Sequence, residues 1–192
     1  MTFAASDQPS ALQPDSHLLS KYAVPGPRYT SYPTAVQFDS DVDATVVART
    51  LAEEHSESRP LSLYVHLPFC QKLCWYCACH KIISRDQSVA DDYLDLLEAE
   101  IAVKRDWFGR REVAQMHLGG GTPTFLSPAQ IARLGEMIDD AFEVADDAEC
   151  GVEIDPRHFS PEQADALAEA GFNRASMGIQ DRRREVQAAI HR

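Results

Sequence analysis

The chain has 192 residues, of which 44% are hydrophobic and 25% are charged, a balance that is ordinary for a globular protein. Its formal net charge is −12, from 18 basic and 30 acidic side chains. That charge argues against general binding to nucleic acid or to an anionic membrane, because both need a basic footprint, although a local basic pocket could still bind a small anion.

The N-terminal stretch has no basic start followed by an apolar run, so it does not have the pattern of a secretory signal. No stretch is apolar for long enough to span a membrane. We therefore expect a cytoplasmic protein whose thiols stay reduced, and clustered cysteines in that compartment are more often metal ligands than disulfides.

Three segments are expected in chain order. Residues 1–20 are polar and predict a mobile tail. Residues 21–60 hold a segment in which Pro25, Gly26, Pro27 and Pro33 exclude regular structure, followed by a helix over about 42–57. Residues 61–192 contain the regular alternation of a folded domain.

The folded domain begins with "LSLYVHLPF", residues 61–69, whose apolar and polar side chains alternate with the period of a strand. A loop rich in cysteine follows, and then a helix from about Ser88 to Trp107. The helical spacing of its apolar residues puts these on one face: Val89, Tyr93, Leu96, Leu97 and Ile101.

Three further strands and their helices complete the pattern. "VAQMHLGGG" (113–121), "CGVEIDP" (150–156) and "NRASMGIQD" (173–181) read as strands. Helices are expected to open at Ser127-Pro128 and Ser160-Pro161, with serine as cap and proline in the first turn. Gly171 ends the second of these, and a last helix starts near Arg183 and runs to the end of the chain at Arg192.

Four successive strand–helix units predict an α/β fold with parallel strands and right-handed crossovers, part of a (β/α) barrel. In such barrels the working residues lie at the carboxyl ends of the strands and in the loops that follow. The cysteine loop, the "GGGTPT" turn, Glu153 and Gln180 all fall at such ends.

The loop "CQKLCWYCACH", residues 70–80, holds four of the five cysteines in the chain: Cys70, Cys74, Cys77 and Cys79. A structural zinc site is one possibility, although two well-separated pairs would suit it better. An iron–sulfur cluster tolerates tight spacing because each thiolate binds a different iron. A dithiol at Cys74 and Cys77 is a further alternative, and Cys150 reads as a buried apolar side chain.

Glu153 stands between Val152 and Ile154 on a strand, so its side chain points away from that apolar pair. A carboxylate inside a barrel needs a partner, which ribose hydroxyls could supply. The alternative is an ion pair at the rim, with Arg157 as the candidate partner.

At this point the sequence resembles the radical S-adenosylmethionine (SAM) enzymes, through C-x3-C-x2-C with Tyr76 before the third cysteine. More narrowly, it resembles oxygen-independent coproporphyrinogen III oxidase. The blocks that carry this likeness run from about residue 21 to the end: "PGPRYTSYPTA", "LYVHLPFCQKLCWYCACHK", "HLGGGTPTFL", "VEIDPR" and "GFNRASMGIQD". Arg182 departs from the family, which usually has an apolar residue there.

The resemblance implies that Cys70, Cys74 and Cys77 hold a 4Fe–4S cluster whose fourth iron is chelated by SAM, with Cys79 accessory to the cluster. It assigns Tyr64, Tyr76, Gly120 and Glu153 to the first SAM. Residues expected to contact a second SAM are Gly121, Thr122, Gln180 and Arg192.

The implied activity is the oxidative decarboxylation of two propionates of coproporphyrinogen III, which gives protoporphyrinogen IX in heme biosynthesis. The implied partners are the porphyrinogen and a flavodoxin-type reductase as electron donor, in a monomeric full-length enzyme. Because family members are longer, we expect this chain to be an N-terminal fragment. Two alternatives are a radical-SAM-like heme chaperone, which usually lacks the cysteine that matches Cys79, and an iron–sulfur electron-transfer module.

Overall fold

The computed structural model describes residues 15–24, 34–38, 42–54, 59–108 and 111–192. The chain divides into two units, Met1–Asp43 and Ala44–Arg192. In the first unit the structure forms helix α1, Ser16–Tyr22, and the short turn η1, Ala35–Gln37. Residues 1–14 of the predicted tail lie outside the described residues, and its last residues fall in α1, which Asp15 caps by accepting a hydrogen bond from the backbone N–H of His17. The Pro25–Pro33 segment lies outside the described residues, and the domain boundaries stay a prediction.

The second unit is built on a four-stranded sheet in the order β1-β4-β5-β6, with every neighbouring pair parallel. Its strands are β1 (Leu61–Leu67), β4 (Glu112–Gly120), β5 (Glu143–Ile154) and β6 (Arg174–Met177). The predicted α/β fold with parallel strands is confirmed. β5 begins earlier than predicted, because residues 143–149 pair with β4 across a shift in register although their sequence does not alternate.

A second, two-stranded sheet was not predicted. It pairs β2 (Phe69–Cys70) with β3 (Ile82–Ile83), and these strands bracket the cysteine loop. Each strand is two residues long, too short to show a periodicity in the sequence.

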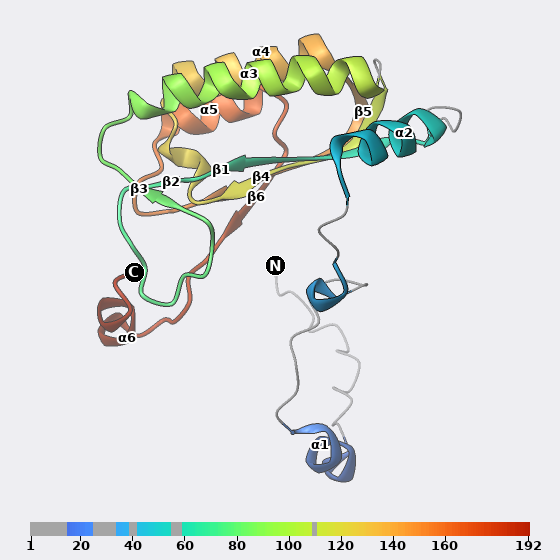
Figure 1. Ribbon diagram of the computed structural model, residues 1–192. Helices are drawn as coiled ribbons and strands as arrows, with labels where there is room; N and C mark the ends of the chain where they lie inside the picture. Colours follow the sequence, from blue (N-terminus) through green and yellow to red (C-terminus); the bar gives the residue numbers. More distant parts are fainter. Residues whose placement is uncertain (1–14, 25–33, 39–41, 55–58, 109–110) are drawn as a thin grey trace, which may run out of the picture. The chain divides into compact units, whose positions relative to one another are not determined.

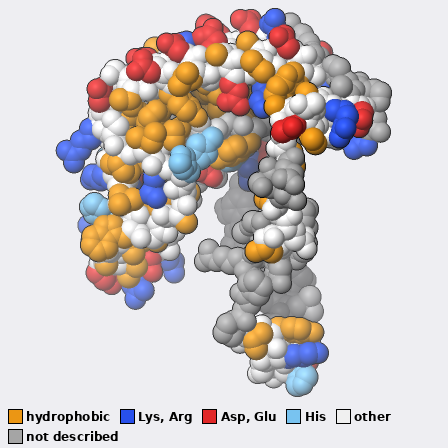
Figure 2. Space-filling view, viewed as in Figure 1, with side chains coloured by type: hydrophobic (Ala, Val, Ile, Leu, Met, Phe, Trp, Pro, Cys, Tyr) orange, Lys and Arg blue, Asp and Glu red, His pale blue; other side chains and the backbone are white. Residues whose placement is uncertain are grey.

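The helices are α2 (Ala44–Glu54), α3 (Val89–Phe108), α4 (Pro128–Ala141), α5 (Pro161–Glu169) and α6 (Arg184–Ala189), with a 3₁₀ turn η2 at Pro123–Phe125. Figure 1 shows α3, α4 and α5 side by side over one face of the sheet. Figure 2 shows acidic side chains along the surface over α3 and α4, where Asp95 and Glu98 both lie 2.7 Å from Nη2 of Arg133.

The predicted helix starts are confirmed. Ser127 and Ser160 each accept a hydrogen bond from a backbone N–H in the first turn, and a glutamine completes both capping boxes. Gly171, with φ of +82°, follows the end of α5 as expected. These local signals need no tertiary context, which is why the sequence locates them correctly.

Two helix predictions need correction. Leu96 of α3 is 70% exposed, whereas Ala90 and Leu94 take the fully buried positions on that helix. α6 ends at Ala189 and does not run to Arg192 as predicted. His191 takes a φ of +63°, and Arg192 returns its backbone N–H to the carbonyl of Gln187 at 2.8 Å. The end of the chain is therefore a closed turn that directs Arg192 back toward the sheet.

The core lies between the sheet and the covering helices. Its largest fully buried side chains come from both layers: Leu67, Leu94, Val113, Leu118, Phe125, Leu126, Leu134 and Ile138. In the part of the chain that the structure describes, no helix has the length and apolar character that crossing a membrane would require.

Candidate active site

A cavity of about 400 Å³ opens at the carboxyl end of the parallel strands. Its volume falls in the range of roughly 300–1,000 Å³ that is usual for small-molecule sites. Its walls come from the cysteine loop, the glycine turn after β4, and the ends of β5 and β6. The cavity brings together all but one of the predicted site residues: Cys70, Cys74, Tyr76, Cys77, Cys79, Gly120, Gly121, Thr122, Glu153, Gln180 and Arg192.

Hydrogen bonds join the two ends of the cysteine loop and also stabilise its interior. Backbone bonds of 2.7 Å from Ile82 N–H to the carbonyl of Pro68, and of 3.0 Å from Ser84 N–H to that of Cys70, join its two ends. Lys81 donates from Nζ to the carbonyls of Cys77 and Cys79, both at 3.1 Å. The loop is thus held in one shape by backbone groups, which leaves its thiols available.

The five cysteines differ in their surroundings, and all are free thiols. Cys150 is buried in the core, as predicted. Cys70 is buried at the cavity wall, where burial raises the pKa of its thiol although Thr122 Oγ1, 3.4 Å away, opposes the shift. Cys74 and Cys77 are half-buried and Cys79 is exposed. Burial also raises the pKa of Cys79, and Cys77 adds to this rise.

The fit of the cysteine loop to a metal group can be judged from this geometry. Among the residues that the structure describes, no three His, Cys, Asp or Glu side chains are arranged to hold one ion. A single zinc ion therefore has no preformed site there. A 4Fe–4S cluster does not need its thiolates to converge on one point, because each binds a different iron. Three thiols lining one cavity suit such a cluster.

The glycine turn brings backbone directly against the cysteine loop. A Cβ on Gly121 would lie 2.6 Å from the carbonyl oxygen of Pro68, so any larger residue would push the two segments apart. Gly120 has a φ of +113°, in the region that favours glycine. Backbone bonds of 2.8 Å run from Gly121 to Leu67 and from Thr122 to Phe69. Glycine is therefore needed for the wall of the cavity to close.

Thr124 supplies a second observation on fit. Its side chain is 3% exposed and lines the cavity, and its hydroxyl has no hydrogen-bond partner among the described residues. An unpaired buried hydroxyl costs roughly 1–3 kcal/mol. A polar ligand in the cavity could supply the missing partner, so the site fits a molecule that offers donors or acceptors at this wall.

Glu153 lies on the sheet face that the helices do not cover, exposed between buried Val152 and Ile154. Nε2 of His117 lies 3.6 Å from the Glu153 carboxylate. The suggested pair with Arg157 is wrong, because Arg157 bonds to Asp155. The Glu153 carboxylate thus faces the cavity and remains half exposed.

Tyr64 is the predicted site residue that does not line the cavity. It is exposed on the same sheet face as Glu153, where its ring stacks on His117 with centroids 6.1 Å apart. Its hydroxyl lies 3.3 Å from Nδ1 of His66. Burial raises the pKa of Tyr64, and the charges of Glu153 and Cys79 raise it further. Tyr64 therefore borders the site through His66 and His117.

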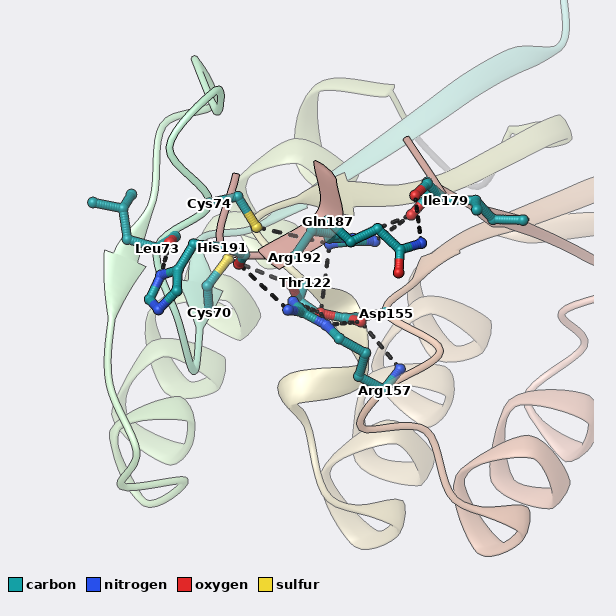
Figure 3. Close-up of polar contacts among 11 residues, drawn as sticks. Cys70, Leu73, Cys74, Thr122, Asp155, Arg157, Ile179, Gln187, His191 and Arg192 are labelled. Atoms are coloured by element: carbon teal, nitrogen blue, oxygen red, sulfur yellow. Dashed lines mark hydrogen bonds and ion pairs between the residues drawn. The ribbon is translucent and has the colours of Figure 1, made fainter. Parts of the chain in front are cut away.

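Sequence reasoning missed Asp155 and Arg157, which line the cavity two and four residues beyond Glu153. Asp155 is 5% exposed and binds Arg157 through the backbone N–H at 3.1 Å and through Nη2 at 2.5 Å. Arg192 Nη1 also lies 3.5 Å from the Asp155 carboxylate (Figure 3). The signal was present as "EIDPR" directly after a strand, where polar residues of this fold meet.

Arg192 connects the far end of the chain to the cysteine loop, and Figure 3 shows it between Cys74 and Asp155. Its Nε and Nη2 donate to the carbonyl of Gly178 at 3.1 and 2.7 Å, and Nη1 lies 3.9 Å from Cys74 Sγ. His191 Nδ1 lies 2.8 Å from the carbonyl of Leu73, and Trp75 N–H donates to the carbonyl of Ile190 at 3.1 Å. The turn after α6 therefore packs against the cysteine loop and places Arg192 at the cavity wall.

The other two residues at this end are Tyr76 and Gln180. Tyr76 is partly exposed, and burial raises the pKa of its hydroxyl while the charge of Arg192 opposes the rise. Gln180 has a φ of +69°, and its side-chain amide nitrogen lies 2.4 Å from where a Cβ on Gly178 would be. Gly178 thus makes room for Gln180 at the cavity rim.

Three comparisons with known proteins bear on this cavity. The sequence pattern described as the Radical SAM superfamily matches residues 64–192. An oxygen-independent coproporphyrinogen III oxidase from Escherichia coli (strain K12) is 48% identical over 178 residues, which cover 93% of this chain and 38% of that protein. One from Mannheimia haemolytica is 48% identical over 142 residues, covering 74% of this chain and 96% of that sequence.

A solved structure, described as "Coproporphyrinogen III oxidase (HemN) from Escherichia coli is a Radical SAM enzyme", superimposes with a TM-score of 0.83 at 46% identity. The match covers 92% of this chain and 39% of that one. The chain therefore spans about two fifths of the length of the Escherichia coli protein, and its fold corresponds to that part.

Proposed function

We propose a function for this chain on the premise that it belongs to the radical SAM superfamily and, within it, to the oxygen-independent coproporphyrinogen III oxidases. The chain forms the part of such an enzyme that binds a 4Fe–4S cluster and SAM. The observation that carries the proposal is the meeting of three separate segments, the cysteine loop, the glycine turn and the end of β5, around one cavity.

Cys70, Cys74 and Cys77 would hold the cluster, and Cys79, at the edge of the same loop, is accessory to it. When bound, the cluster and SAM supply reductive cleavage of a sulfonium and a radical able to abstract hydrogen from an unactivated carbon. The protein's own contribution is position, because the braced loop and the closed turn after α6 hold the thiols against the cavity.

The remaining residues would hold SAM. Glu153 would accept hydrogen bonds from ribose hydroxyls, since its carboxylate lines the cavity half exposed. The backbone of Gly120 and the side chain of Tyr76 would complete that first site, with Tyr64 outside the cavity lining but on the same sheet face as Glu153. A second SAM would contact Gly121, Thr122, Gln180 and Arg192, which line the same cavity. The guanidinium of Arg192 suits a carboxylate.

For the whole enzyme we propose the oxidation of coproporphyrinogen III, the substrate in the names of the relatives, by oxidative decarboxylation of two propionate side chains to vinyl groups. A low-potential reductant of the flavodoxin type would supply the electron. These steps are proposed for the full-length enzyme. This chain covers only 38% of the Escherichia coli relative.

The test is anaerobic reconstitution of the chain with iron and sulfide, followed by EPR of the dithionite-reduced protein with and without SAM. A 4Fe–4S signal that changes when SAM is added is the expected result, because an open iron site senses its new ligand. A cluster signal indifferent to SAM would instead favour an electron-transfer module. Tightly held zinc without a cluster would overturn the proposal.

A pair of variants makes the ligand assignment specific. Cys74→Ala removes a thiol at the cavity and should reduce the bound cluster at least tenfold. Cys150→Ala removes a thiol that is buried in the core and does not line the cavity, and should leave iron and sulfide content at the wild-type level. Loss of iron in the Cys150 variant would count against the assignment.

A further inference from the structure

The buried carboxylate of Asp155 holds two arginines at the cavity wall. Arg157 donates its backbone N–H and Nε to Oδ1 of this carboxylate and its Nη2 to Oδ2, and Nη1 of Arg192 lies 3.5 Å from Oδ2. Burial alone would raise the pKa of Asp155, but the hydrogen bonds of Arg157 and the charges of both arginines bring that pKa below its ordinary value. Asp155 is therefore ionised and paired at neutral pH.

The pattern Asp-x-Arg also occurs at a second place in the chain, away from the cavity wall. Asp181 and Arg183 are also two residues apart, and Arg183 donates its backbone N–H to Asp181 at 2.8 Å and its Nε at 3.2 Å. That arginine is mostly exposed and is not among the residues that line the cavity. The Asp-x-Arg turn thus depends only on residues close in sequence. Asp155 differs from Asp181 because it is buried beside the cysteine loop.

One of the guanidinium groups held by Asp155 reaches Cys74, because Nη1 of Arg192 lies 3.9 Å from Cys74 Sγ. Arg157 lies beside it, and its Nη1 donates to the carbonyl of His191 at 3.5 Å. The single carboxylate of Asp155 offsets only one of the charges of Arg157 and Arg192. These three side chains therefore carry a net positive charge beside Cys74, which the proposed function assigns to the cluster.

We propose that Asp155 is a positioning residue, whose carboxylate holds the guanidinium group of Arg192 against the sulfur of Cys74 and that of Arg157 beside it, and so makes the cluster easier to reduce. The inference rests on the proposed function. Positive charge and hydrogen bonds at a thiolate sulfur stabilise the state with the added electron, because they offset its extra negative charge. The reductant in the test is dithionite, which gives up the one electron that the cluster gains.

The test is to measure the midpoint potential of the reconstituted cluster in the full 192-residue chain by an EPR-monitored titration with dithionite. Arg157→Gln removes one of the two charges and should shift the oxidised-to-reduced equilibrium at least tenfold toward the oxidised cluster, about 59 mV for one electron. Arg157→Lys, which keeps the charge, should recover part of that shift. Arg183→Gln is the matched control and should leave the potential unchanged.

Asp155→Asn separates positioning from simple charge. Removing a negative group would by itself make the cluster easier to reduce, whereas releasing the guanidinium groups would make reduction harder. We expect the second result, a shift in the same direction as Arg157→Gln. A shift in the opposite direction, or none, would overturn the positioning role.

Two further readouts keep the outcomes distinct. Iron content and far-UV circular dichroism of each variant must equal those of the wild type, so that a shifted potential is not a folding defect. A wild-type chain that takes up no cluster would overturn the proposed function and this inference with it. If the wild-type chain binds the cluster but its midpoint potential equals that of Arg157→Gln, this inference alone is overturned.

Discussion

The helix-covered face of the sheet and the cavity at its carboxyl end use buried polar groups differently. Under the helices, Gln163 is 6% exposed, and its Nε2 donates to the carbonyls of Thr124 and Leu126 at 2.7 and 2.6 Å. At the cavity, the buried hydroxyl of Thr124 has no partner among the described residues. The carbonyl of Thr124 thus accepts a hydrogen bond on the core side, whereas its hydroxyl on the cavity side has no partner among the described residues. This difference indicates that the cavity is shaped for a ligand.

Cysteine shows the same difference. Cys150, under the helices, packs as a small apolar side chain. The four loop cysteines line the cavity as free thiols in a loop braced by backbone bonds. Changes in the first region should therefore affect mainly the stability of the fold, whereas changes in the second should affect ligand binding and have smaller effects on stability.

The largest effect on stability is expected from the helix-covered face. Leu134→Ala removes a fully buried side chain of α4 and should lower the free energy of unfolding by about 2–5 kcal/mol. Leu96→Ala on α3, a position that the structure leaves 70% exposed, should change it by less than about 0.5 kcal/mol. Urea unfolding of both variants measures the difference, and equal losses would contradict the assignment of the core.

The next effect is expected at the cavity wall. Gly121→Ala places a Cβ 2.6 Å from the carbonyl oxygen of Pro68, which should cost about 1–3 kcal/mol and also reduce cluster uptake, because the turn and the cysteine loop must separate. Gly171→Ala meets no atom within 4 Å. It should cost about 1–2 kcal/mol through its positive φ alone, with iron uptake unchanged. Impaired uptake in both variants would argue against a specific role for the glycine turn.

A smaller effect is expected from the helix caps. Ser160→Ala removes the hydroxyl that accepts the backbone N–H of Gln163, and should lower the free energy of unfolding by about 1 kcal/mol. Ser127→Ala removes the equivalent bond to Gln130 and serves as the matched control. Thermal or urea unfolding should give similar losses, since both caps have the same geometry. A loss well above 2 kcal/mol at one of them would show that the cap also holds tertiary contacts.

The smallest effect is a dependence of stability on pH from the cavity region. Asp155 has a folded-state pKa below its ordinary value of 3.8, so its contribution is fully present above that value and is lost as pH falls through the lower folded value. The free energy of unfolding of the cluster-free chain should therefore decrease between pH 5 and 3 more in the wild type than in Asp155→Asn. Identical slopes would show that the pairing with arginine contributes nothing.

The strand–helix succession and the helix caps could be predicted because they depend on neighbours in sequence. The alternation of "LSLYVHL" and the pair Ser127-Pro128 are local patterns, and both are confirmed. The early start of β5 and the two-residue strands β2 and β3 could not be found in this way, since their hydrogen bonds come from partners distant in the chain. Leu96 was misplaced because helical spacing alone does not say which face another element will cover.

For the candidate site, the sequence alone predicts residues that the structure brings to one cavity: Cys70, Cys74 and Cys77, the glycine turn, and Glu153. The folded structure was needed to find that Arg192 turns back to the cysteine loop, that Arg157 binds Asp155, and that the Thr124 hydroxyl has no partner among the described residues. The reason is physical. A local pattern determines a side chain's direction along its own strand or helix, whereas its partners depend on the packing of segments far apart in the chain.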